Sequence, residues 1–239
     1  MALTAKFRGH PVVLRGEFSQ MRQSASYWEE NLFSNHYVWS NSFTQEDETR
    51  FEVSLNVPSI ALEVSAWQGV ISNKIYYDAQ SMVAQSSDAI SLTSLYARKD
   101  FRLGGFHFDH RVLLQWSTNQ EVIPVPLCSA FLSYYYECWV ERNKVLRLQF
   151  GVDGKFNTSY YAPSYNPALA TFYNQREYEI GNYPYLDVFL TAKWKRMRIF
   201  LKYQHVNYNL FGNGHYLTTA GYPLNPGMFK FGISWGFYD

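Results

Sequence analysis

The last segment of this chain alternates strictly between two kinds of residue. One set is apolar, and the other, apart from one methionine, is small or polar: Phe229, Phe231, Ile233, Trp235 and Phe237 against Met228, Lys230, Gly232, Ser234 and Gly236. A period of two predicts a β-strand with one set on each face of a sheet. So many aromatic rings on one face exceed what a soluble edge strand normally exposes. The pattern therefore predicts a strand of a transmembrane β-barrel, with its apolar face in lipid and its other face in the lumen.

Other segments alternate in the same way, and their polar sets carry charges of both signs. We expect an all-β, antiparallel transmembrane β-barrel with about eleven or twelve strands in this chain. A further strand is expected to point Phe131, Tyr135 and Trp139 inward, and residues 21–35 are expected to form a short helix or a packed loop. The other predicted strands are 2–8, 12–20, 36–44, 49–57, 60–68, 88–98, 102–116, 144–157, 184–195, 198–208 and 228–237.

The links between these strands alternate in length. Tight, charged turns are predicted at 98–100, 142–143 and 195–197, and long polar links at 117–128, 158–183 and 209–227. Outer-membrane barrels have short periplasmic turns and long outer loops, whereas a soluble sandwich has no reason for this alternation. The rule places the C-terminus, Asp239, on the periplasmic side. If 69–87 is an outer loop, counting strands backwards puts 21–35 in the periplasm.

Composition supports the barrel and excludes two other classes of protein. Aromatic residues make up 19% of the chain, with 20 Tyr and 7 Trp. Barrels carry such residues at both membrane interfaces, so we expect an aromatic girdle that includes Trp194, Trp235 and Phe237. No apolar run approaches the roughly 18–20 residues of a transmembrane helix, which excludes a helical membrane protein. The net charge of +1 gives no electrostatic footprint for nucleic acid.

Neither the cysteines nor the N-terminus indicates a separate structural feature. Cys128 and Cys138 have the spacing of neither a disulfide framework nor a metal site. The first residues, 1–6, have neither the basic start nor the hydrophobic stretch of a secretory signal. Because an exported barrel needs a signal, either the signal has been removed or the chain is the C-terminal part of a longer protein. We favour the second explanation and expect residues 1–239 to be one barrel domain.

Local strings extend this interpretation to a family. They are SNHY at 34–37 with Trp39, YYAP at 160–163, YNP at 165–167, FYNQ at 172–175, IGNYPYLDVF at 180–189 and FGISWGFYD at 231–239. From about residue 30 to the end, the chain resembles the putative porins of the Bacteroidetes outer membrane. The resemblance implies an outer-membrane location, a pore, and family members that are longer at the N-terminus. It also implies that the aromatic C-terminal strand is recognised by the barrel-assembly machinery.

Charged residues on the expected lumen face are candidates for the pore wall. Cations outnumber acids across the last four predicted strands, although Glu137 and Glu141 on the preceding strand weaken this bias. A positive wall would give a mild preference for anionic solutes. The candidate pore-lining residues are Arg111, Arg147, Asp153, Lys155, Asp187, Lys193, Arg198, Lys202 and Lys230.

The link 158–183 is rich in tyrosine and asparagine. Tyr161, Tyr165, Asn166 and Tyr173 are candidates for a constriction of the pore or for a carbohydrate or peptide site. The other interpretation, which we favour, is an outer loop that packs on itself and on the girdle. Pro163 and Pro167 stiffen the segment, which suits a constriction better than a flexible lid.

Three patterns could indicate enzymatic or metal chemistry, and none is specific. His107 and His110 fall on opposite faces of a strand and cannot share one ion without a bulge. Ser234 faces inward, whereas alternation puts His205 on the lipid or interface side. The acidic run 46–48 lacks the glycine and spacing of a calcium loop and is expected to be a solvated hairpin turn. We therefore expect no catalytic residue, no metal and no cofactor.

The favoured function is a passive diffusion channel for small hydrophilic solutes in the bacterial outer membrane. The alternative is a non-conducting barrel that acts as a binding or scaffold module, which inward Phe131, Tyr135, Trp139 and Phe189 would favour by filling the lumen. A soluble lipocalin-like barrel is a weaker third hypothesis, since it predicts fewer strands and apolar residues inside. The expected partners are the lipid bilayer, the assembly machinery and small solutes.

Overall fold

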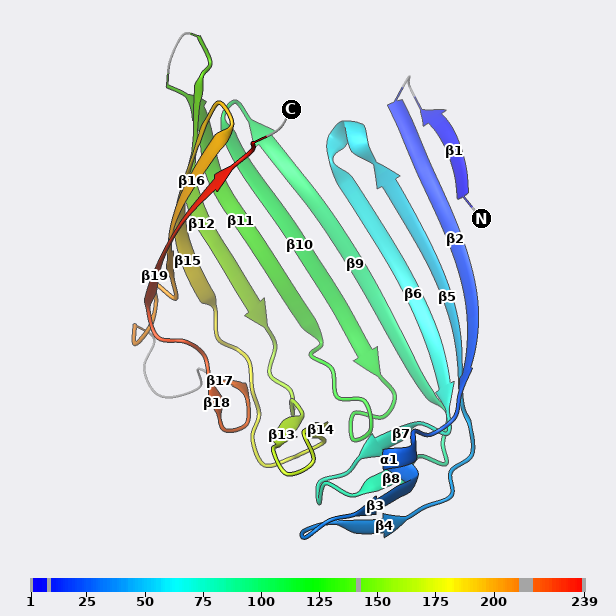
Figure 1. The fold of residues 1–239 in the computed structure, drawn as a ribbon. Coiled ribbons are helices and arrows are strands. Elements are labelled where there is room, and N and C mark those ends of the chain that lie inside the picture. The colour runs from blue at the N-terminus through cyan, green and yellow to red at the C-terminus, as the bar shows by residue number, and fades with distance from the viewer. Residues whose placement is uncertain (1, 8–9, 141–142, 211–216, 238–239) are drawn as a thin grey trace.

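The computed structural model describes residues 2–7, 10–140, 143–210 and 217–237, and these form one antiparallel sheet of 11 strands with small hairpins at one end (Figure 1). Neighbours in the sheet are also neighbours in chain order, as in an up-and-down barrel. The all-β antiparallel fold class is thus confirmed. The strands are β1 (Ala2–Phe7), β2 (His10–Gln23), β5 (Glu46–Val57), β6 (Leu62–Ser72), β9 (Ile90–Leu103), β10 (Phe106–Ser117), β11 (Cys128–Trp139), β12 (Leu146–Asn157), β15 (Tyr185–Trp194), β16 (Met197–Gln204) and β19 (Met228–Trp235).

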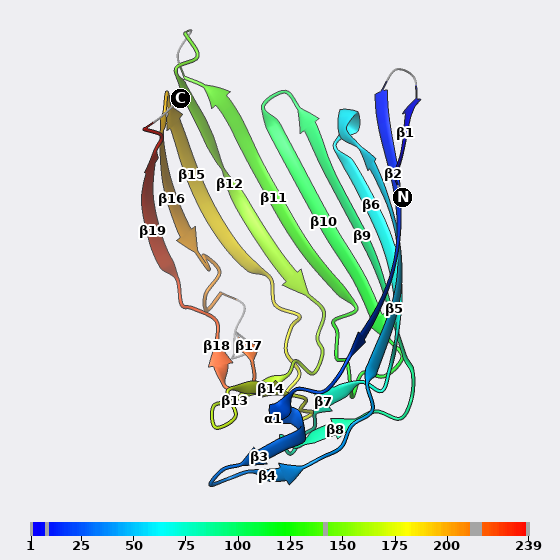
Figure 2. The same ribbon diagram turned by 45° about the vertical axis from the view of Figure 1, so that its right-hand side comes forward.

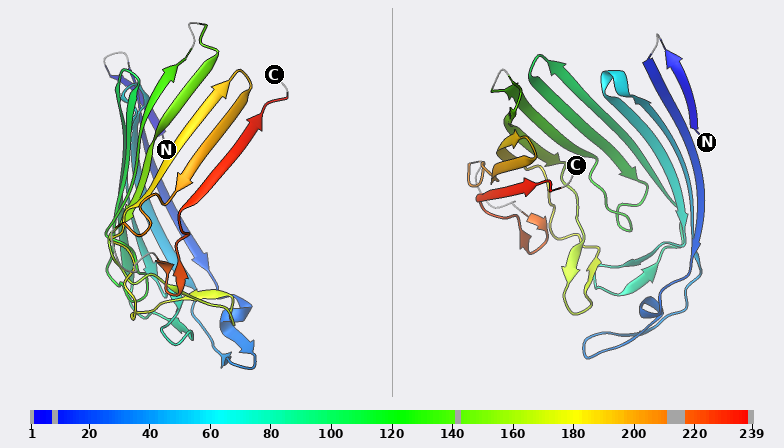
Figure 3. Two further views of the ribbon diagram at one scale, coloured as in Figure 1. Left: turned by 90° about the vertical axis from the view of Figure 1, so that its left-hand side faces the viewer. Right: turned by 45° about the horizontal axis from the view of Figure 1, so that its top comes forward.

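The sheet curves into an open trough (Figures 2 and 3). Strands β1 and β19 form its two edges and are not paired with each other. Successive strands cross the trough side by side, so each strand presents one face to the concave side and one to the convex side. Among the described residues, no helix is both long enough and apolar enough to cross a membrane.

Short and long connections alternate along the whole chain. The β9–β10 link has two residues and the β15–β16 link has two, while the links 24–45, 73–89, 118–127, 158–184 and 205–227 are long. All of the long links lie at one end of the sheet (Figure 1). Strand β19 ends at the opposite end, with the short turns, and Asp239 itself lies outside the described residues, as does Arg142 of one predicted turn.

The long links contain their own small elements, which gather at that end of the sheet (Figures 1 and 2). A capping box formed by Ser26 and Glu29 starts the single helical turn α1. The elements are α1 (Tyr27–Glu30), β3 (Asn31–Phe33), β4 (Val38–Ser40), β7 (Ile75–Tyr77), β8 (Val83–Gln85), β13 (Ser164–Asn166), β14 (Thr171–Tyr173), β17 (Leu217–Thr219) and β18 (Tyr222–Pro223); a 3-10 turn, η1 (Pro58–Ile60), lies at the other end.

The predicted strand 36–44 is wrong. Only Val38–Ser40 is extended, as β4 of a two-stranded hairpin outside the main sheet. Its Trp39 is buried with Ile75 and Val83 and donates a hydrogen bond of 2.9 Å to the carbonyl of Trp28. The alternation in this segment therefore serves a small core among the loops. Because 36–44 is not a strand of the main sheet, one strand fewer separates 21–35 from 69–87, and both segments lie at the same end of the sheet. The expectation that 21–35 lies on the opposite, periplasmic side from that loop is therefore also wrong.

Two other expectations, both based on charged stretches, are also wrong. The predicted turn 98–100 lies inside β9, which continues to a turn at Gly104, where φ is +60°. The acidic run 46–48 begins β5 instead of forming a hairpin turn: Glu46 pairs with Lys74 at 3.0 Å, and Asp47 pairs with Arg22 at 2.5 Å. In a sheet with a polar face, charges occur within strands as well as in turns, so a charged stretch does not by itself identify a turn.

The convex face is apolar from one strand to the next. The strand register aligns Phe106, Tyr136, Phe150, Leu190, Leu201 and Phe231 in one row. Most of these large side chains are exposed, and few hydrophobic residues of the sheet are buried. Each such side chain gains about 1.5–3 kcal/mol when it leaves water for an apolar environment. The face that a soluble protein would have to cover is therefore the face that a bilayer covers.

Candidate functional site on the concave face

Polar and charged side chains share the concave face. In register across β12, β15 and β16, Arg147 pairs with Lys193 and Lys193 with Arg198. Further along the same face, Asp153 pairs with Asp187 and Lys202 with Lys230. The register places every predicted wall residue on this face: Arg111, Arg147, Asp153, Lys155, Asp187, Lys193, Arg198, Lys202 and Lys230.

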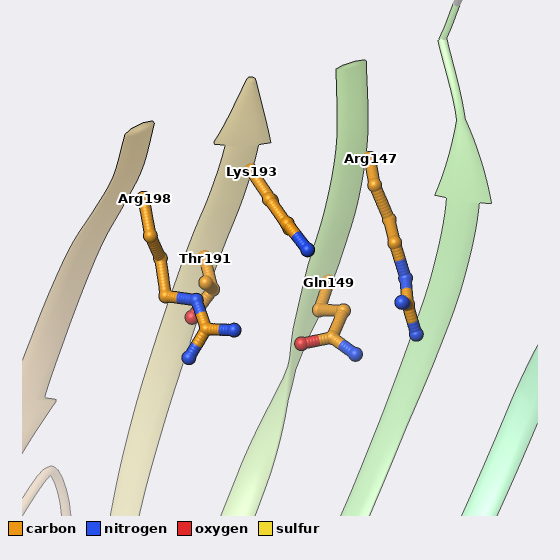
Figure 4. Close-up of a pocket in the computed structure, with 5 residues that line it drawn as sticks. All are labelled: Arg147, Gln149, Thr191, Lys193 and Arg198. Atoms are coloured by element: carbon orange, nitrogen blue, oxygen red, sulfur yellow. The ribbon is translucent and has the colours of Figure 1, made fainter. Parts of the chain in front are cut away.

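Three cations form a basic cluster near the short-turn end. They are Arg147, Lys193 and Arg198, and they border a pocket of about 150 Å³ together with Gln149 and Thr191. Figure 4 shows that these five side chains come from neighbouring strands. Arg147 is paired with Glu137 of β11. Among the described residues, Lys193 and Arg198 have no acidic partner within salt-bridge distance. Their charges are thus uncompensated and face the trough.

Lys202, by contrast, is fully compensated. Its ammonium lies 2.9 Å from a carboxylate oxygen of Asp153 and 2.9 Å from one of Asp187. Asp187 is only 1% exposed and also accepts the backbone N–H of His205 at 3.0 Å. Ser133 donates to Asp153 at 2.7 Å. A count of charges along the sequence therefore overstates how positive the middle of the wall is.

A second compensated group occupies β9 and β10. Asp109 accepts hydrogen bonds from Arg98 at 3.1 Å and from Arg111 at 2.8 Å, and Arg111 also stacks over the ring of Phe131 at 5.0 Å. His107 stacks on Tyr135 on the same face. His110 lies on the convex face, where its Nε2 is 2.8 Å from the hydroxyl of Tyr134. The two histidines are therefore on opposite sides of the sheet and cannot share one ion.

The candidate loop residues pack against other loops. Asn166 of β13 donates to the hydroxyl of Tyr37 at 2.7 Å, which joins two loops far apart in the sequence. Tyr165 contacts Tyr222 with ring centroids 5.9 Å apart, while Tyr173 lies in β14 opposite Ser164. Tyr161 precedes this hairpin and stays exposed. These contacts build one loop layer, formed by the small hairpins, at the end of the sheet.

The expected position of His205 is wrong. Its side chain is fully buried, with φ of +55°, just beyond the end of β16. Its Nδ1 donates to the carbonyl of Asn225 at 2.6 Å, and its Nε2 lies 2.7 Å from the hydroxyl of Tyr183. Ser234 pairs with Arg198, seven residues before His205, which corresponds to roughly 23 Å along a strand. The structure does not bring these two residues together.

A larger cavity, which the strand pattern alone does not reveal, lies where the last strands meet the loops. Its volume is about 570 Å³, and strands β11, β12, β15, β16 and β19 contribute to its wall together with the links that follow β12 and β16. The predicted wall residues Lys155 and Lys230 border it, and so do Tyr160, Tyr185 and Asn225, which the sequence does not single out as site residues. Since these residues come from separate segments, only their convergence in the fold identifies the cavity.

The candidate girdle residues lie at the short-turn end. Trp194 and Trp235 both pair with Met197, so the three side chains form a row on the convex face. They border a pocket of about 240 Å³ that also contains Lys195 and Arg196. Phe237 is 78% exposed. An apolar row flanked by cations is the arrangement expected at a membrane–water interface.

Comparisons with known proteins agree on the architecture. A family model described as "Putative porin" matches residues 1–239. The pyoverdine outer membrane receptor FpvA from Pseudomonas aeruginosa is similar with a TM-score of 0.64 and 10% identity, over 99% of this chain and 35% of that one. The copper transporter OprC has a TM-score of 0.64 and 13% identity, over 97% and 37%.

The FrpB iron transporter from Neisseria meningitidis has a TM-score of 0.59 and 11% identity, over 97% of this chain and 38% of that one. At these identities the likeness shows the fold alone. The chain spans just over a third of the length of these solved structures. No curated protein matches it.

Proposed function

The chain belongs to the putative porin family, and from that premise we propose that it forms part of the wall of a passive diffusion channel for small hydrophilic solutes. It is a β-barrel protein of the bacterial outer membrane. In the proposed channel no residue performs chemistry. Solutes are selected by the width of the lumen and by the charges that line it.

The observation that carries the proposal is the division of the sheet into two faces. One face is apolar and exposed, while the other carries ladders of charged residues that continue from strand to strand. Burying such ladders in a dry interior would cost several kcal/mol for each ion. A water-filled lumen keeps them hydrated, which is what a diffusion channel provides.

The uncompensated cations give the proposed channel a mild preference for anions. Lys193 and Arg198 face the trough without an acidic partner among the described residues, whereas Lys202 and Arg111 are paired with carboxylates. Reversal potentials measured across planar bilayers in a KCl gradient test this directly. We expect chloride to be favoured, and we expect the double variant K193Q/R198Q to shift the potential towards potassium.

A folded barrel with no conductance would overturn the channel, and cation selectivity of the unmodified protein would overturn the charge preference.

The second candidate is a non-conducting binding or scaffold module. Its support is the aromatic pair Tyr135 and Phe189, whose ring centroids lie 6.4 Å apart on the concave face, together with the loop layer. Two of the solved neighbours are named as a receptor and a transporter. A stoichiometric partner in pull-downs, without solute flux into liposomes, would favour this module.

A further inference from the structure

The cavity of about 570 Å³ at the loop end of the trough has the properties of a ligand site. We infer that it binds an anionic carbohydrate, a short sugar chain that carries carboxylate groups. Its volume lies within the roughly 300–1,000 Å³ of typical small-molecule sites. The inference rests on the proposed function, since it takes the ligand to be a solute that travels along the lumen wall.

Charge argues for an anion. Lys155 and Lys230 enter the cavity from β12 and β19, and no aspartate or glutamate is among the described residues that line it. Within the described part of the chain, neither ammonium has a carboxylate within salt-bridge distance; Lys155 has only a cation–π contact, 5.9 Å from the ring of Tyr185. The neighbouring Lys202 shows the contrasting arrangement, with two carboxylates at 2.9 Å. The cavity therefore holds two unneutralised positive charges, which suit carboxylates.

The remaining lining argues for sugar hydroxyls. Tyr160 and Tyr185 each contribute a ring and a hydroxyl, and neither hydroxyl has a hydrogen-bond partner among the described residues. Asn157 and Asn225 add amide groups, which both donate and accept. Ring faces pack against the apolar C–H faces of sugars, while hydroxyls and amides match a series of alternating donors and acceptors. A simple inorganic anion would leave most of these groups unused.

The walls of the cavity are held in place by the surrounding structure. The buried His205 bonds to the carbonyl of Asn225 and to the hydroxyl of Tyr183, which ties the link after β16 to the link before β15. Tyr160 and Ile180 form an isolated β-bridge, with N···O distances of 3.0 and 2.9 Å. A wall fixed in advance lowers the entropic cost of binding.

Titration calorimetry on the purified protein in detergent tests the inference. The probes are trigalacturonate, the neutral trisaccharide maltotriose, and tricarballylate, which has carboxylates but no sugar ring. We expect trigalacturonate to bind more tightly than either of the others. K155Q and K230Q should each raise the dissociation constant by about tenfold, the loss expected for one charge-assisted hydrogen bond. The matched control K193Q removes an exposed lysine at the other end of the wall and should have little effect.

Heat-dependent migration in gels confirms that each variant is folded. The inference is overturned if folded wild-type protein does not bind trigalacturonate, if maltotriose or tricarballylate binds equally well, or if K193Q weakens binding as much as K155Q. Conductance measured on the same preparations separates the two proposals. A protein that conducts without binding trigalacturonate refutes only the ligand site, and a protein that binds it without conducting refutes only the channel.

Discussion

At the scale of single residues, the concave face combines paired and unpaired charges. Asp187 is almost completely buried, and its carboxylate is matched by the ammonium of Lys202 at 2.9 Å. Lys193, on the same strand as Asp187, is exposed and has no such partner in the described part of the chain. Substitutions of these two lysines should therefore have very different consequences for stability, although both remove one positive charge.

We expect K202M to destabilise the folded protein by about 1–3 kcal/mol, because it leaves the buried carboxylate of Asp187 unpaired. The loss stays within this range because part of the site is open to water. K193M should change stability by less than about 0.5 kcal/mol. Urea unfolding of protein reconstituted in vesicles measures both. Adding D187N to K202M should recover part of the loss, and equal effects of the two lysine variants would contradict the pairing.

Tyr160, in the link after β12, makes the stability of the folded protein depend on pH in the alkaline range. Burial raises the pKa of Tyr160 above its ordinary value of about 10. Its neutral form is thus favoured in the folded state. The associated stability is fully present below the ordinary pKa and is lost as the pH rises through the raised pKa.

We therefore expect the unfolding midpoint of wild-type protein to fall more steeply above about pH 10 than that of Y160F. Urea titrations at a series of pH values compare the two slopes. The phenylalanine keeps the ring and removes only the ionisable group, so it is a matched control. Parallel slopes would show that burial does not perturb this hydroxyl.

At the scale of elements, β12 depends on a glycine where it passes between two aromatic residues. Gly151 pairs with Tyr135 of β11 on one side and with Phe189 of β15 on the other. A Cβ added at Gly151 would lie 2.5 Å from the Cβ of Tyr135 and closer still to the carbonyl oxygen of Tyr134. Backbone would have to move to admit it. Gly16 of β2 has no atom within 4 Å of the corresponding position.

We expect G151A to destabilise the barrel by about 1–3 kcal/mol through overpacking between the strands. G16A should be neutral, or stabilising by up to about 1 kcal/mol, because it restricts only the unfolded chain. Thermal loss of the heat-modifiable gel form ranks the two variants against wild type. A G151A protein as stable as G16A would indicate that β11 and β12 separate easily.

At the scale of the whole molecule, the open sheet leaves two edges. Neither the outer side of β1 nor that of β19 has a strand beside it among the described residues. A strand edge in lipid is not tolerated, because every backbone group there must find a hydrogen-bond partner. Both edges must therefore be paired in the membrane.

Hydrogen exchange of the native protein in the membrane tests this requirement. We expect the backbone amides of β1 and β19 to be protected to the same degree as those of β9, which is paired on both sides. Peptides from Ala2–Phe7 and Met228–Trp235 are compared with peptides from Ile90–Leu103 by mass spectrometry. Rapid exchange confined to the two edge strands would contradict closure of the barrel.

The sequence predicts much of the sheet and of its two faces. The alternation in 144–157, 184–195 and 228–237 places Arg147, Lys193 and Lys230 on the face where the structure has them. It does not identify Trp39 as part of a loop core, or His205 as a buried residue bonded to Tyr183 and Asn225. In both cases the segment alternates, but its partners come from other links.

The sequence by itself determines which side chains share a face, because the backbone of a strand turns successive side chains to opposite sides whatever surrounds it. It also determines that strands joined by a short turn are neighbours in the sheet, because a link of two residues allows no other pairing. The tertiary structure alone decides which charges are neutralised and where a cavity forms. Lys202 and Lys230 are adjacent lysines on one face. Among the described residues, only Lys202 of these two meets carboxylates, because Asp153 and Asp187 reach it from two other strands.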